Sequence, residues 1–393
     1  MSGPPPRIAS LALEPYALPF ARPFETTGGR LVERRGFLLR VRDGQGRQGT
    51  GEAAPLPDFG GESLAACEAR LRHWCQTLRD AALPELAPPD AALPDAALPD
   101  PAPPDIAAPD LLAAVLGPAC AEALAATPVA CHALEGALLD LAAQRAGLPL
   151  ARLLHPHAAG AVPVNATLGG DAPAAAAAAA RAAVEAGFGT LKLKVGVGGA
   201  AADEARLRAV RAAVGPGPRL RIDANGAWGR EQAAALLARW APLGLEYAEQ
   251  PLPAADVEGM AWLAARSPVP IAADEALRTA ADAERLLAAR AASVLVLKPT
   301  LLGGAAVTLA IARRALAAGA AVVVTTVLEG IYGRLAALHL AAAIAALHRA
   351  TGRPLPACGL ATGPLLARDH LPAPPAPARG EWTLPAGPGL GVG

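Results

Sequence analysis

The stretch that decides the fold begins with TLKLKV at residues 190–195. Four more apolar runs follow at nearly equal spacing: RLRIDA (219–224), LEYAEQ (245–250), VPIAADE (269–275) and SVLVLK (293–298). Alanine-rich segments with helical apolar spacing separate these runs. Strands that alternate with helices at this period are joined by helical crossovers, so they run parallel and are buried on both faces.

Further strand-like runs extend the series on both sides. VPVNATL (162–168) precedes it, AVVVTT (321–326) follows it, and PACGL (356–360) is a short candidate for an eighth strand. Eight strand–helix units within about 200 residues favour a closed β/α barrel, although an open sheet remains the alternative on spacing alone. We therefore predict an α/β fold with a (β/α)8-type, modified TIM barrel over residues 156–366.

The segments on either side of the barrel predict a second, smaller unit. Residues 1–155 contain strand patterns followed by helical apolar spacing, which indicates an N-terminal α+β capping domain. Within it, residues 80–110 are rich in Pro, Ala and Asp and repeat AALPD in tandem. Proline at this density prevents helix or sheet, so we predict a disordered insertion. We expect residues 367–393 to return to the cap and complete it.

Composition excludes several classes of protein. The 393 residues carry a formal net charge of zero, so bulk electrostatics give no reason to expect nucleic acid or an anionic membrane as partner. The five cysteines form no CxxC pair and no zinc-like spacing, which is typical of a reduced, cytoplasmic protein. The N-terminus lacks a signal-peptide pattern, and no apolar run stays free of Arg, Asp, Glu and Pro for the roughly 18 residues that a membrane span needs. Self-association is the one macromolecular partnership left open.

Charged side chains stand at the ends of the predicted barrel strands, where a buried strand has no packing use for them. Successive positions lie 24 to 29 residues apart, one strand–helix unit each, and they are Lys194, Asp223, Glu249, Asp274 and Lys298. They should therefore recur at one height around the carboxyl-terminal mouth of the barrel, where barrel enzymes keep their chemistry. One such residue is usually a solvated loop residue or a helix cap, but a set in register indicates a site.

Asp223, Glu249 and Asp274 predict a metal centre. Three carboxylates buried together without a cation would have raised pKa values and would cost several kcal/mol. A divalent cation removes that penalty. Oxygen ligands without His or Cys favour Mg²⁺, with Mn²⁺ as the alternative, over Zn²⁺.

The lysines predict proton abstraction next to a carboxylate. Lys192 and Lys194 lie two apart on one strand, so both point to the same face. One ammonium group lowers the pKa of its neighbour, and a nearby metal adds to this effect, which would free a neutral amine to act as a base. Lys298 lies four strands further on, across the barrel mouth. Cationic groups on both sides of a metal-bound carboxylate suit removal of an α-proton and stabilisation of the resulting enediolate.

These residues resemble the enolase superfamily, in its muconate-lactonizing subgroup, over nearly the whole chain. The ordered motifs that carry the resemblance are GEAAPLPDFGGES (51–63), ALEGALLDLAAQRAGLPL (133–150), LKLKVG (191–196), RIDANGAW (221–228), EQPL (249–252), ADEAL (273–277) and LKPTLLGG (297–304). Within the subgroup, TTVLEGIYGR (325–334) and CGLATGPLL (358–366) are most similar to the o-succinylbenzoate synthase family. The Asp-x-Asp that dipeptide epimerases tend to carry after the last strand is absent.

This resemblance implies a specific reaction, the syn-dehydration of 2-succinyl-6-hydroxy-2,4-cyclohexadiene-1-carboxylate to o-succinylbenzoate, a precursor of menaquinone or phylloquinone. It implies that Lys194 removes the α-proton and returns it to the leaving hydroxyl group. By the same similarity Lys298 stabilises the enediolate, and Lys192 steadies Lys194. The partner would be a small-molecule carboxylate.

Other polar and loop residues are candidates for supporting roles. Asn225 is expected to orient groups near the metal, and Glu275 either pairs with Lys298 or caps a helix. The residues with a possible substrate contact lie in the expected lid and in the loops after the last strands: Thr27, Arg35, Pro57, Phe59, Thr325, Thr326, Gly330 and Gly359.

Two alternatives remain open on the sequence. The same scaffold could serve an N-succinylamino acid racemase or a cycloisomerase, because Lys194 and Lys298 could act on opposite faces of a substrate. A non-catalytic binding protein on the same barrel is the alternative from a different class, and the intact set of charged residues argues against it.

Overall fold

The computed structural model describes residues 6–26, 29–84, 110–169 and 172–392. Its strands are β1 (Ile8–Thr26), β2 (Gly29–Asp43), β3 (Gln48–Ala53), β4 (Ala161–Pro163), β5 (Ala166–Leu168), β6 (Thr190–Lys194), β7 (Arg219–Asp223), β8 (Leu245–Glu249), β9 (Ile271–Ala273), β10 (Val294–Leu297), β11 (Ala321–Val324) and β12 (Glu381–Thr383). The α-helices are α1 (Leu64–Thr77), α2 (Leu111–Leu116), α3 (Cys120–Ala126), α4 (Pro128–Ala146), α5 (Leu150–Leu154), α6 (Pro173–Glu185), α7 (Ala200–Val214), α8 (Arg230–Trp240), α9 (Val257–Ala264), α10 (Ala280–Ala288), α11 (Pro299–Leu302), α12 (Ala305–Ala317) and α13 (Ile331–Ala350). Short 3-10 turns occur at Pro57–Phe59, Gly117–Ala119, Ala241–Leu243 and Gly363–Leu365.

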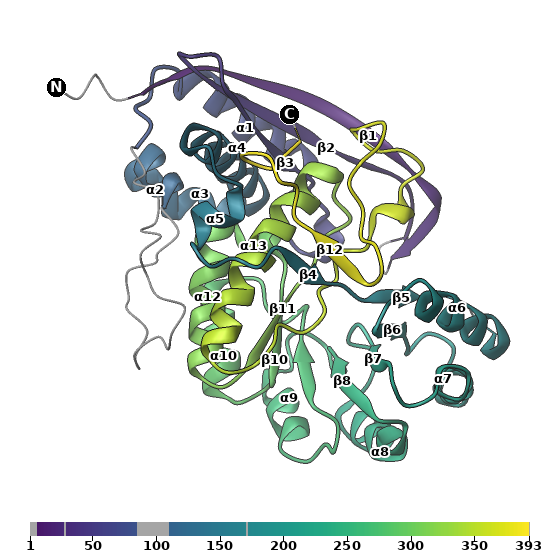
Figure 1. The fold of residues 1–393 in the computed structure, drawn as a ribbon. Helices are drawn as coiled ribbons and strands as arrows, with labels where there is room; N and C mark the ends of the chain where they lie inside the picture. The colour runs from purple at the N-terminus through teal and green to yellow at the C-terminus, as the bar shows by residue number, and fades with distance from the viewer. Residues whose placement is uncertain (1–5, 27–28, 85–109, 170–171, 393) are drawn as a thin grey trace.

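A parallel sheet in the order β11-β10-β9-β8-β7-β6-β5 curls into the wall of a barrel (Figure 1). The predicted eighth strand closes it: Cys358 bridges Val164 beside β5, and Gly359 bridges Thr325 after β11. Helices α6 to α10 and α12 line the outside of the sheet in Figure 1, as expected for βα units. The prediction of a β/α barrel is confirmed, and the open sheet is excluded.

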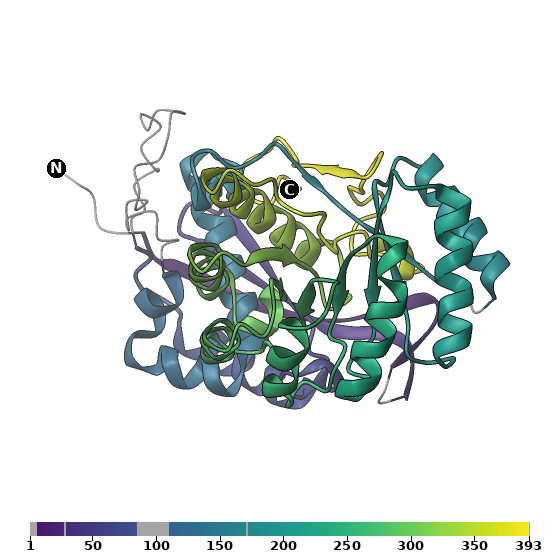
Figure 2. The same ribbon diagram turned by 90° about the horizontal axis from the view of Figure 1, so that it is seen from below.

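The N-terminal residues form a separate α+β layer over the barrel, as predicted. β1, β2 and β3 make an antiparallel sheet, and the long β1–β2 hairpin runs along the molecule beside the barrel (Figures 1 and 2). Helix α4 packs against β3 so closely that a Cβ atom on Gly51 would lie 1.8 Å from the carbonyl oxygen of Ala133. Glycine is required at this position because the backbones of strand and helix nearly touch.

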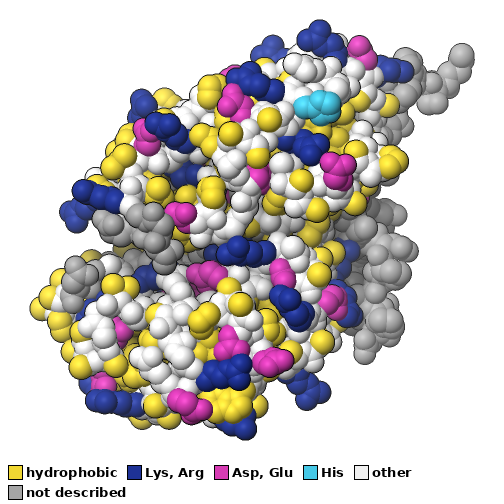
Figure 3. Space-filling view, turned by 180° about the vertical axis from the view of Figure 1, so that it is seen from behind, with side chains coloured by type: hydrophobic (Ala, Val, Ile, Leu, Met, Phe, Trp, Pro, Cys, Tyr) yellow, Lys and Arg dark blue, Asp and Glu magenta, His cyan; other side chains and the backbone are white. Residues whose placement is uncertain are grey.

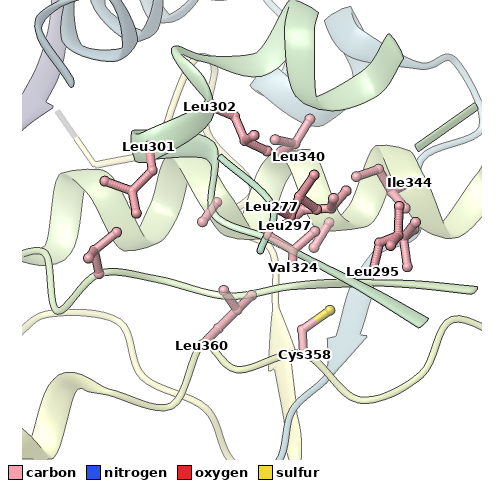
Figure 4. Packing of buried hydrophobic residues seen from close by; sticks show 14 of the residues in the cluster. Leu277, Leu295, Leu297, Leu301, Leu302, Val324, Leu340, Ile344, Cys358 and Leu360 are labelled. Carbon is pink, nitrogen blue, oxygen red and sulfur yellow. The ribbon is translucent and has the colours of Figure 1, made fainter. Parts of the chain in front are cut away.

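The hydrophobic core connects the barrel strands to α13. Figure 4 shows Leu295 and Leu297 of β10 and Val324 of β11 beside Leu340 and Ile344 of α13. All five side chains are buried. The strands read as continuous aliphatic runs because they are covered on both faces.

Cap carboxylates bind the first turns of two barrel helices. Glu52 of β3 accepts hydrogen bonds from the backbone N–H groups of Gly330 (2.7 Å) and Gly333 (2.8 Å) at the start of α13. Glu135 of α4 accepts from the N–H groups of Ala305 and Ala306 at the start of α12. A carboxylate satisfies the free N–H groups and the positive end of a helix dipole, so these contacts fix the cap on the barrel.

The C-terminal segment runs back along the cap. β12 pairs with β4, Ala367 donates its N–H to the carbonyl oxygen of Pro19 in β1, and Leu390 donates its N–H to Asp140 of α4. Of the segment 80–110 that was predicted to be disordered, residues 85–109 lie outside the described residues. Its ends are ordered: Ala82 bridges Arg7, and Asp110 caps α2.

Helix α13 is, within the described part of the chain, the one helix long and apolar enough to cross a membrane, and 89% of its apolar window is buried inside the protein. That burial is typical of a core helix. On the face shown in Figure 3, basic and acidic side chains are interspersed, in agreement with the zero net charge.

Candidate active site

The three predicted metal ligands lie side by side at the carboxyl ends of adjacent strands. Asp223 ends β7, Glu249 ends β8, and Asp274 follows β9 by one residue. The sheet register pairs Asp223 with Glu249, and Glu249 with the residue two before Asp274. Their side chains are buried, with 0%, 2% and 5% of each residue exposed.

The lysines contact these carboxylates directly. The Nζ atom of Lys192 lies 2.8 Å from Glu249 Oε1 and 3.1 Å from Asp223 Oδ2. The Nζ atom of Lys194 lies 2.6 Å from Asp223 Oδ2. Lys298, one residue beyond β10, lies 2.6 Å from Asp274 Oδ1. The structure therefore brings all six predicted charged residues into one cluster.

The exposure of the lysine side chains differs in a way that bears on their roles. Lys192 and Lys298 have 13% and 8% of their side chains exposed, whereas Lys194 has 43% exposed. Lys194 is thus the most exposed amine of the three.

Lysine occurs at only three positions in the whole chain, 192, 194 and 298, and the other 32 basic side chains are arginine. Arginine has a pKa above about 12 and does not yield a neutral base, whereas lysine does so when its environment permits. The occurrence of lysine at these three positions alone is a feature of the sequence that points to the cluster independently of motif spacing.

The buried carboxylates and ammonium groups of the cluster shift one another's pKa values. Burial and the charge of Asp223 raise the pKa of Glu249 to about 8. Burial lowers the pKa of Lys192, but the negative charges of Glu249 and Asp223 raise it by more. The pKa of Lys192 therefore lies well above its ordinary value. The raised pKa of Lys192 is contrary to a role as a neutral amine.

Burial and neighbouring charges also act in opposite directions on the pKa values of Asp223 and Lys298. Burial favours the neutral acid at Asp223, yet the ammonium groups of Lys194 and Lys192 lower its pKa. Burial lowers the pKa of Lys298, but the charges of Asp274 and Glu275 raise it overall.

The donor set fits a divalent cation such as Mg²⁺. Asp223, Glu249 and Asp274 offer oxygen ligands only, the kind that Mg²⁺ prefers, and all three residues are buried. Asp274 Oδ1 has an ammonium group nearby but no hydrogen bond in acceptable geometry. In the present arrangement no group of three or more His, Cys, Asp or Glu side chains among the described residues is already poised to hold a metal. Ammonium groups occupy the carboxylate oxygens instead.

Asn225 and Glu275 form a bridge beside Lys194. The side-chain oxygen of Asn225 accepts from Lys194 Nζ at 2.8 Å, and its amide nitrogen donates to Glu275 Oε1 at 2.7 Å. Glu275 was expected either to pair with Lys298 or to cap a helix. Its bond instead goes to Asn225, and Lys298 pairs with Asp274.

The cap contributes residues 57–60 to the barrel mouth. The ring of Phe59 has Lys298 Nζ 5.6 Å from its centroid, a cation–π distance. Pro57 begins the same 3-10 turn and is itself exposed. A Cβ atom on Gly60 would meet the guanidinium of Arg278 at 2.7 Å, so this turn lies directly on the barrel loop after β9.

The two arginines of β2 take different environments. Arg35 has 66% of its side chain exposed, and its recorded ion pair is with Glu33 of the same strand. Arg34 is buried and donates to the carbonyl oxygens of Ala54, Pro55 and Val327. Neighbours on a strand face opposite sides, and in this structure Arg34, not Arg35, makes the contact between cap and barrel. Thr27 lies outside the described residues.

The loops after the last strands are joined by hydroxyl groups. Thr325 donates to the carbonyl oxygen of Gly359, and the hydroxyl of Thr326 lies 3.1 Å from that of Thr362. Thr362 was not predicted from the sequence. Gly330 lies against Glu52 and His370, and its N–H is donated to Glu52.

Two family models match the chain. The model described as enolase C-terminal domain-like matches residues 174–393, and the model described as MenC, N-terminal domain, matches residues 9–96. Together they cover the cap sheet and most of the barrel.

Curated relatives include o-succinylbenzoate synthases. The protein of Thermobifida fusca is 42% identical over 180 residues, 46% of this chain and 53% of the relative. That of Mycobacterium tuberculosis is 41% identical over 220 residues, 56% of this chain and 63% of the relative. The matches thus span a little over half the length of these relatives.

Solved structures match over nearly the full length. A dipeptide epimerase from Enterococcus faecalis, complexed with Mg and the dipeptide L-Leu-L-Tyr, is 27% identical with a TM-score of 0.81, covering 98% of this chain and 99% of that one. Muconate lactonizing enzyme from Pseudomonas fluorescens is 28% identical with a TM-score of 0.81, covering 98% and 96%. The family model matches more than half of the chain, the solved structures share its fold, and the chain belongs to the enolase superfamily.

Proposed function

We propose that this protein is a Mg²⁺-dependent o-succinylbenzoate synthase, which dehydrates 2-succinyl-6-hydroxy-2,4-cyclohexadiene-1-carboxylate. The observation that carries the proposal is the convergence of Lys194, Lys298 and three carboxylates at one end of the barrel. The curated relatives support the choice of substrate within the superfamily.

In this proposal Lys194 is the base. Its partial exposure lets a substrate approach, and contacts with Asp223 and Asn225 fix the direction of its Nζ atom. The neutral amine takes the proton from the carbon next to the carboxylate, and the electron pair of the broken C–H bond moves into the enediolate. Lys192, which Glu249 and Asp223 hold as a cation, lies two residues before the base on the same strand and contacts the same Asp223 carboxylate.

Lys298 stabilises the enediolate. It is buried, its pKa is raised by Asp274 and Glu275, and Phe59 covers it from the cap. A fixed ammonium group in a dry site stabilises developing negative charge more strongly than the same group in water. When the electron pair returns to the ring, the hydroxyl group leaves, and the Lys194 ammonium gives it the proton, so that water and o-succinylbenzoate are released.

Asp223, Glu249 and Asp274 would hold the cation. The bound Mg²⁺ would supply positive charge to the substrate carboxylate and so acidify the adjacent C–H bond. The contacts of Lys192 and Lys298 with these carboxylates would then lengthen, since the cation takes over their compensation.

The cap and the loops after the last strands would enclose the rest of the substrate. Phe59 and Pro57 would wall the site, and Thr325, Thr326 and Gly359 would line its far side together with Thr362. We retain residues 1–155, 156–366 and 367–393 as the proposed division into cap, barrel and returning segment.

A substrate comparison tests the assignment. Purified protein is assayed with the cyclohexadiene carboxylate and with an N-succinylamino acid, each with Mg²⁺ and with a chelator. We expect rapid, Mg²⁺-dependent loss of water from the first. Turnover of the N-succinylamino acid alone would instead establish a racemase on the same site.

A further inference from the structure

Lys194 is the last residue of β6, and its backbone lies beyond the support of one neighbouring strand. The pairing of β5 with β6 ends at Leu168 and Leu193 in the described residues, one position before Lys194. On the other side, Val195 donates its N–H to the carbonyl oxygen of Asp223 in β7 at 2.9 Å. One edge of the strand end that carries the base therefore needs another partner.

Helix α7 provides that partner through two side chains. Arg206 donates from Nη2 to the carbonyl oxygen of Lys194 at 2.9 Å. Asp203 accepts the N–H of Gly196 through Oδ2 at 2.7 Å. The two side chains also form an ion pair with each other. The pair thus spans the strand end, with one bond to residue 194 and one to residue 196.

Gly196 explains why the backbone needs a fixed turn here. Its φ is +92°, and a Cβ atom at this position would lie 2.6 Å from that of Ala227. The chain therefore bends at Gly196, two residues after Lys194. The Asp203 carboxylate accepts the N–H of Gly196 at this bend. Beside these bonds, the backbone bond from Val195 to Asp223 ties the same strand end to β7.

The burial of this ion pair is weak evidence that it serves stability. Asp203 is fully buried and Arg206 is 8% exposed. Replacing a buried ion pair with apolar side chains is often neutral or stabilising, because removing both charges from water is costly. Arg208 on the same helix pairs with Glu204, but it has 58% of its side chain exposed and no recorded bond to β6.

We propose that Asp203 and Arg206 are positioning residues for Lys194, which set the place from which its amine reaches the substrate. This proposal rests on the role proposed above for Lys194. A displacement of about 1 Å at a reacting group can cost on the order of 100-fold in rate. Loss of the Arg206 bond should therefore lower kcat by about 10- to 100-fold, with KM and the affinity for Mg²⁺ changed by less than about threefold.

The restriction of lysine to three positions gives a direct readout. Protein labelled with ¹³C at lysine shows side-chain NMR signals from Lys192, Lys194 and Lys298 only. Single Lys→Arg substitutions assign the signals. In Arg206→Met we expect the Lys194 signal to shift while the other two stay in place.

Three companion variants make the outcome decisive. Asp203→Asn with Arg206→Met removes both buried charges, keeps an acceptor for the Gly196 N–H and loses the donor to Lys194; it should fold and reproduce the fall in kcat. Arg206→Lys keeps a charged donor and should stay within about fivefold of the wild-type kcat. Arg208→Met is the matched control and should change neither kcat nor the lysine signals.

A folded Arg206→Met or Asp203→Asn/Arg206→Met protein with wild-type kcat and an unmoved Lys194 signal would overturn the positioning role. If the wild-type protein fails to dehydrate the cyclohexadiene carboxylate, the proposed function is wrong, and the Lys194 signal alone then decides the positioning role. An unmoved signal rejects it, and a selective shift supports it.

Discussion

Asn225 adopts a backbone conformation that most side chains avoid, with a φ of 45°. Asparagine tolerates this region better than other residues with a Cβ atom, because its side chain bonds locally. Here the backbone N–H of Asn225 donates to Asp223, while its side chain connects Lys194 to Glu275. The unusual backbone thus delivers an amide to a position between the base and a carboxylate.

Replacement of Asn225 by glycine removes the side-chain bond to Lys194 and keeps the backbone conformation, so it distinguishes the two contributions. Glycine accepts the same φ without strain, so the fold and the melting temperature should be nearly unchanged. Loss of the bond to Lys194 should lower kcat by about 10-fold. Steady-state kinetics and thermal unfolding measure both effects. A glycine variant with wild-type kcat would reduce Asn225 to a turn residue.

Lys192 compensates two buried carboxylates, and its replacement by methionine tests the metal centre. Removal of one partner from a buried ion pair typically costs about 3–5 kcal/mol. We expect Lys192→Met to melt well below the wild type in chelator and to regain most of the difference when Mg²⁺ is added, since the cation takes the place of the ammonium group.

The control for that experiment is Arg219→Met, which removes an exposed partner of Glu246 and leaves the bond from Arg221 to Glu246 in place. Its melting temperature should respond to Mg²⁺ as the wild type does. Equal, Mg²⁺-independent destabilisation in both variants would argue against a cation at Asp223, Glu249 and Asp274.

At the residue level, spacing predicted which charged side chains meet, and the structure adds what they do to one another. Strand ends one βα unit apart had to share the barrel mouth. Spacing could not show that Lys192 would be held as a cation, because this depends on two carboxylates from other strands. It also could not choose between Arg34 and Arg35 without the register of β2.

At the level of elements, helix α4 carries a buried acid whose titration should affect stability. Burial is the main cause that raises the pKa of Glu135 from 4.5 to about 7, although bonds from Ala306 and Ala305 oppose it. The folded state therefore keeps this proton over a pH range where the unfolded chain loses it. Stability from Glu135 is fully present below pH 4.5 and is lost as the pH rises through about 7.

Glu135→Gln isolates this contribution. Relative to the glutamine variant, the free energy of unfolding of the wild type should fall by up to about 3 kcal/mol between pH 4.5 and 7 and stay level above that range. Urea unfolding at a series of pH values measures it. Glu258→Gln, at an exposed position of α9, is the control and should show no such trend. A difference independent of pH would contradict a buried, protonated Glu135.

The strand predictions show where local pattern stops being informative. VPVNATL was expected as one strand, but it divides at Asn165 into β4, which pairs with β12, and β5, which enters the barrel. The partner of β4 lies more than 200 residues away in sequence, so no local feature marks the division. The eighth strand was correctly placed because its apolar run has no other role in a closed barrel.

At the level of the whole molecule, the C-terminal end connects the cap to the barrel. Trp382 of β12 is 1% exposed, and the guanidinium of Arg334 in α13 lies 5.8 Å from the centre of one of its rings. Trp382→Ala should lower the free energy of unfolding by about 3–5 kcal/mol, the usual cost of deleting a buried tryptophan. Chemical unfolding measures the loss.

Trp262→Ala provides the comparison, since Trp262 is only partly buried and has Arg266 above its ring. It should cost clearly less. If both variants lose the same stability, the C-terminal segment is not part of the cooperative core.

The overall architecture could be predicted because its period is regular and its motifs occur in order. The hydrogen bonds from the starts of α12 and α13 to Glu135 and Glu52 could not be predicted. In the sequence these two residues are ordinary helix and strand positions, because their partners come from distant parts of the chain. The same holds for Asp203 and Arg206, whose spacing on α7 is that of any helical ion pair.

The measurement that tests the central claim most directly is turnover of substrate deuterated at the carbon next to the carboxylate, by wild type and by Lys194→Ala, with saturating Mg²⁺. We predict slower turnover of the deuterated substrate by the wild type, and a loss of about 10²- to 10⁴-fold in kcat for Lys194→Ala with Mg²⁺ binding retained. A folded Lys194→Ala protein that keeps wild-type turnover would contradict the assignment of Lys194 as the base.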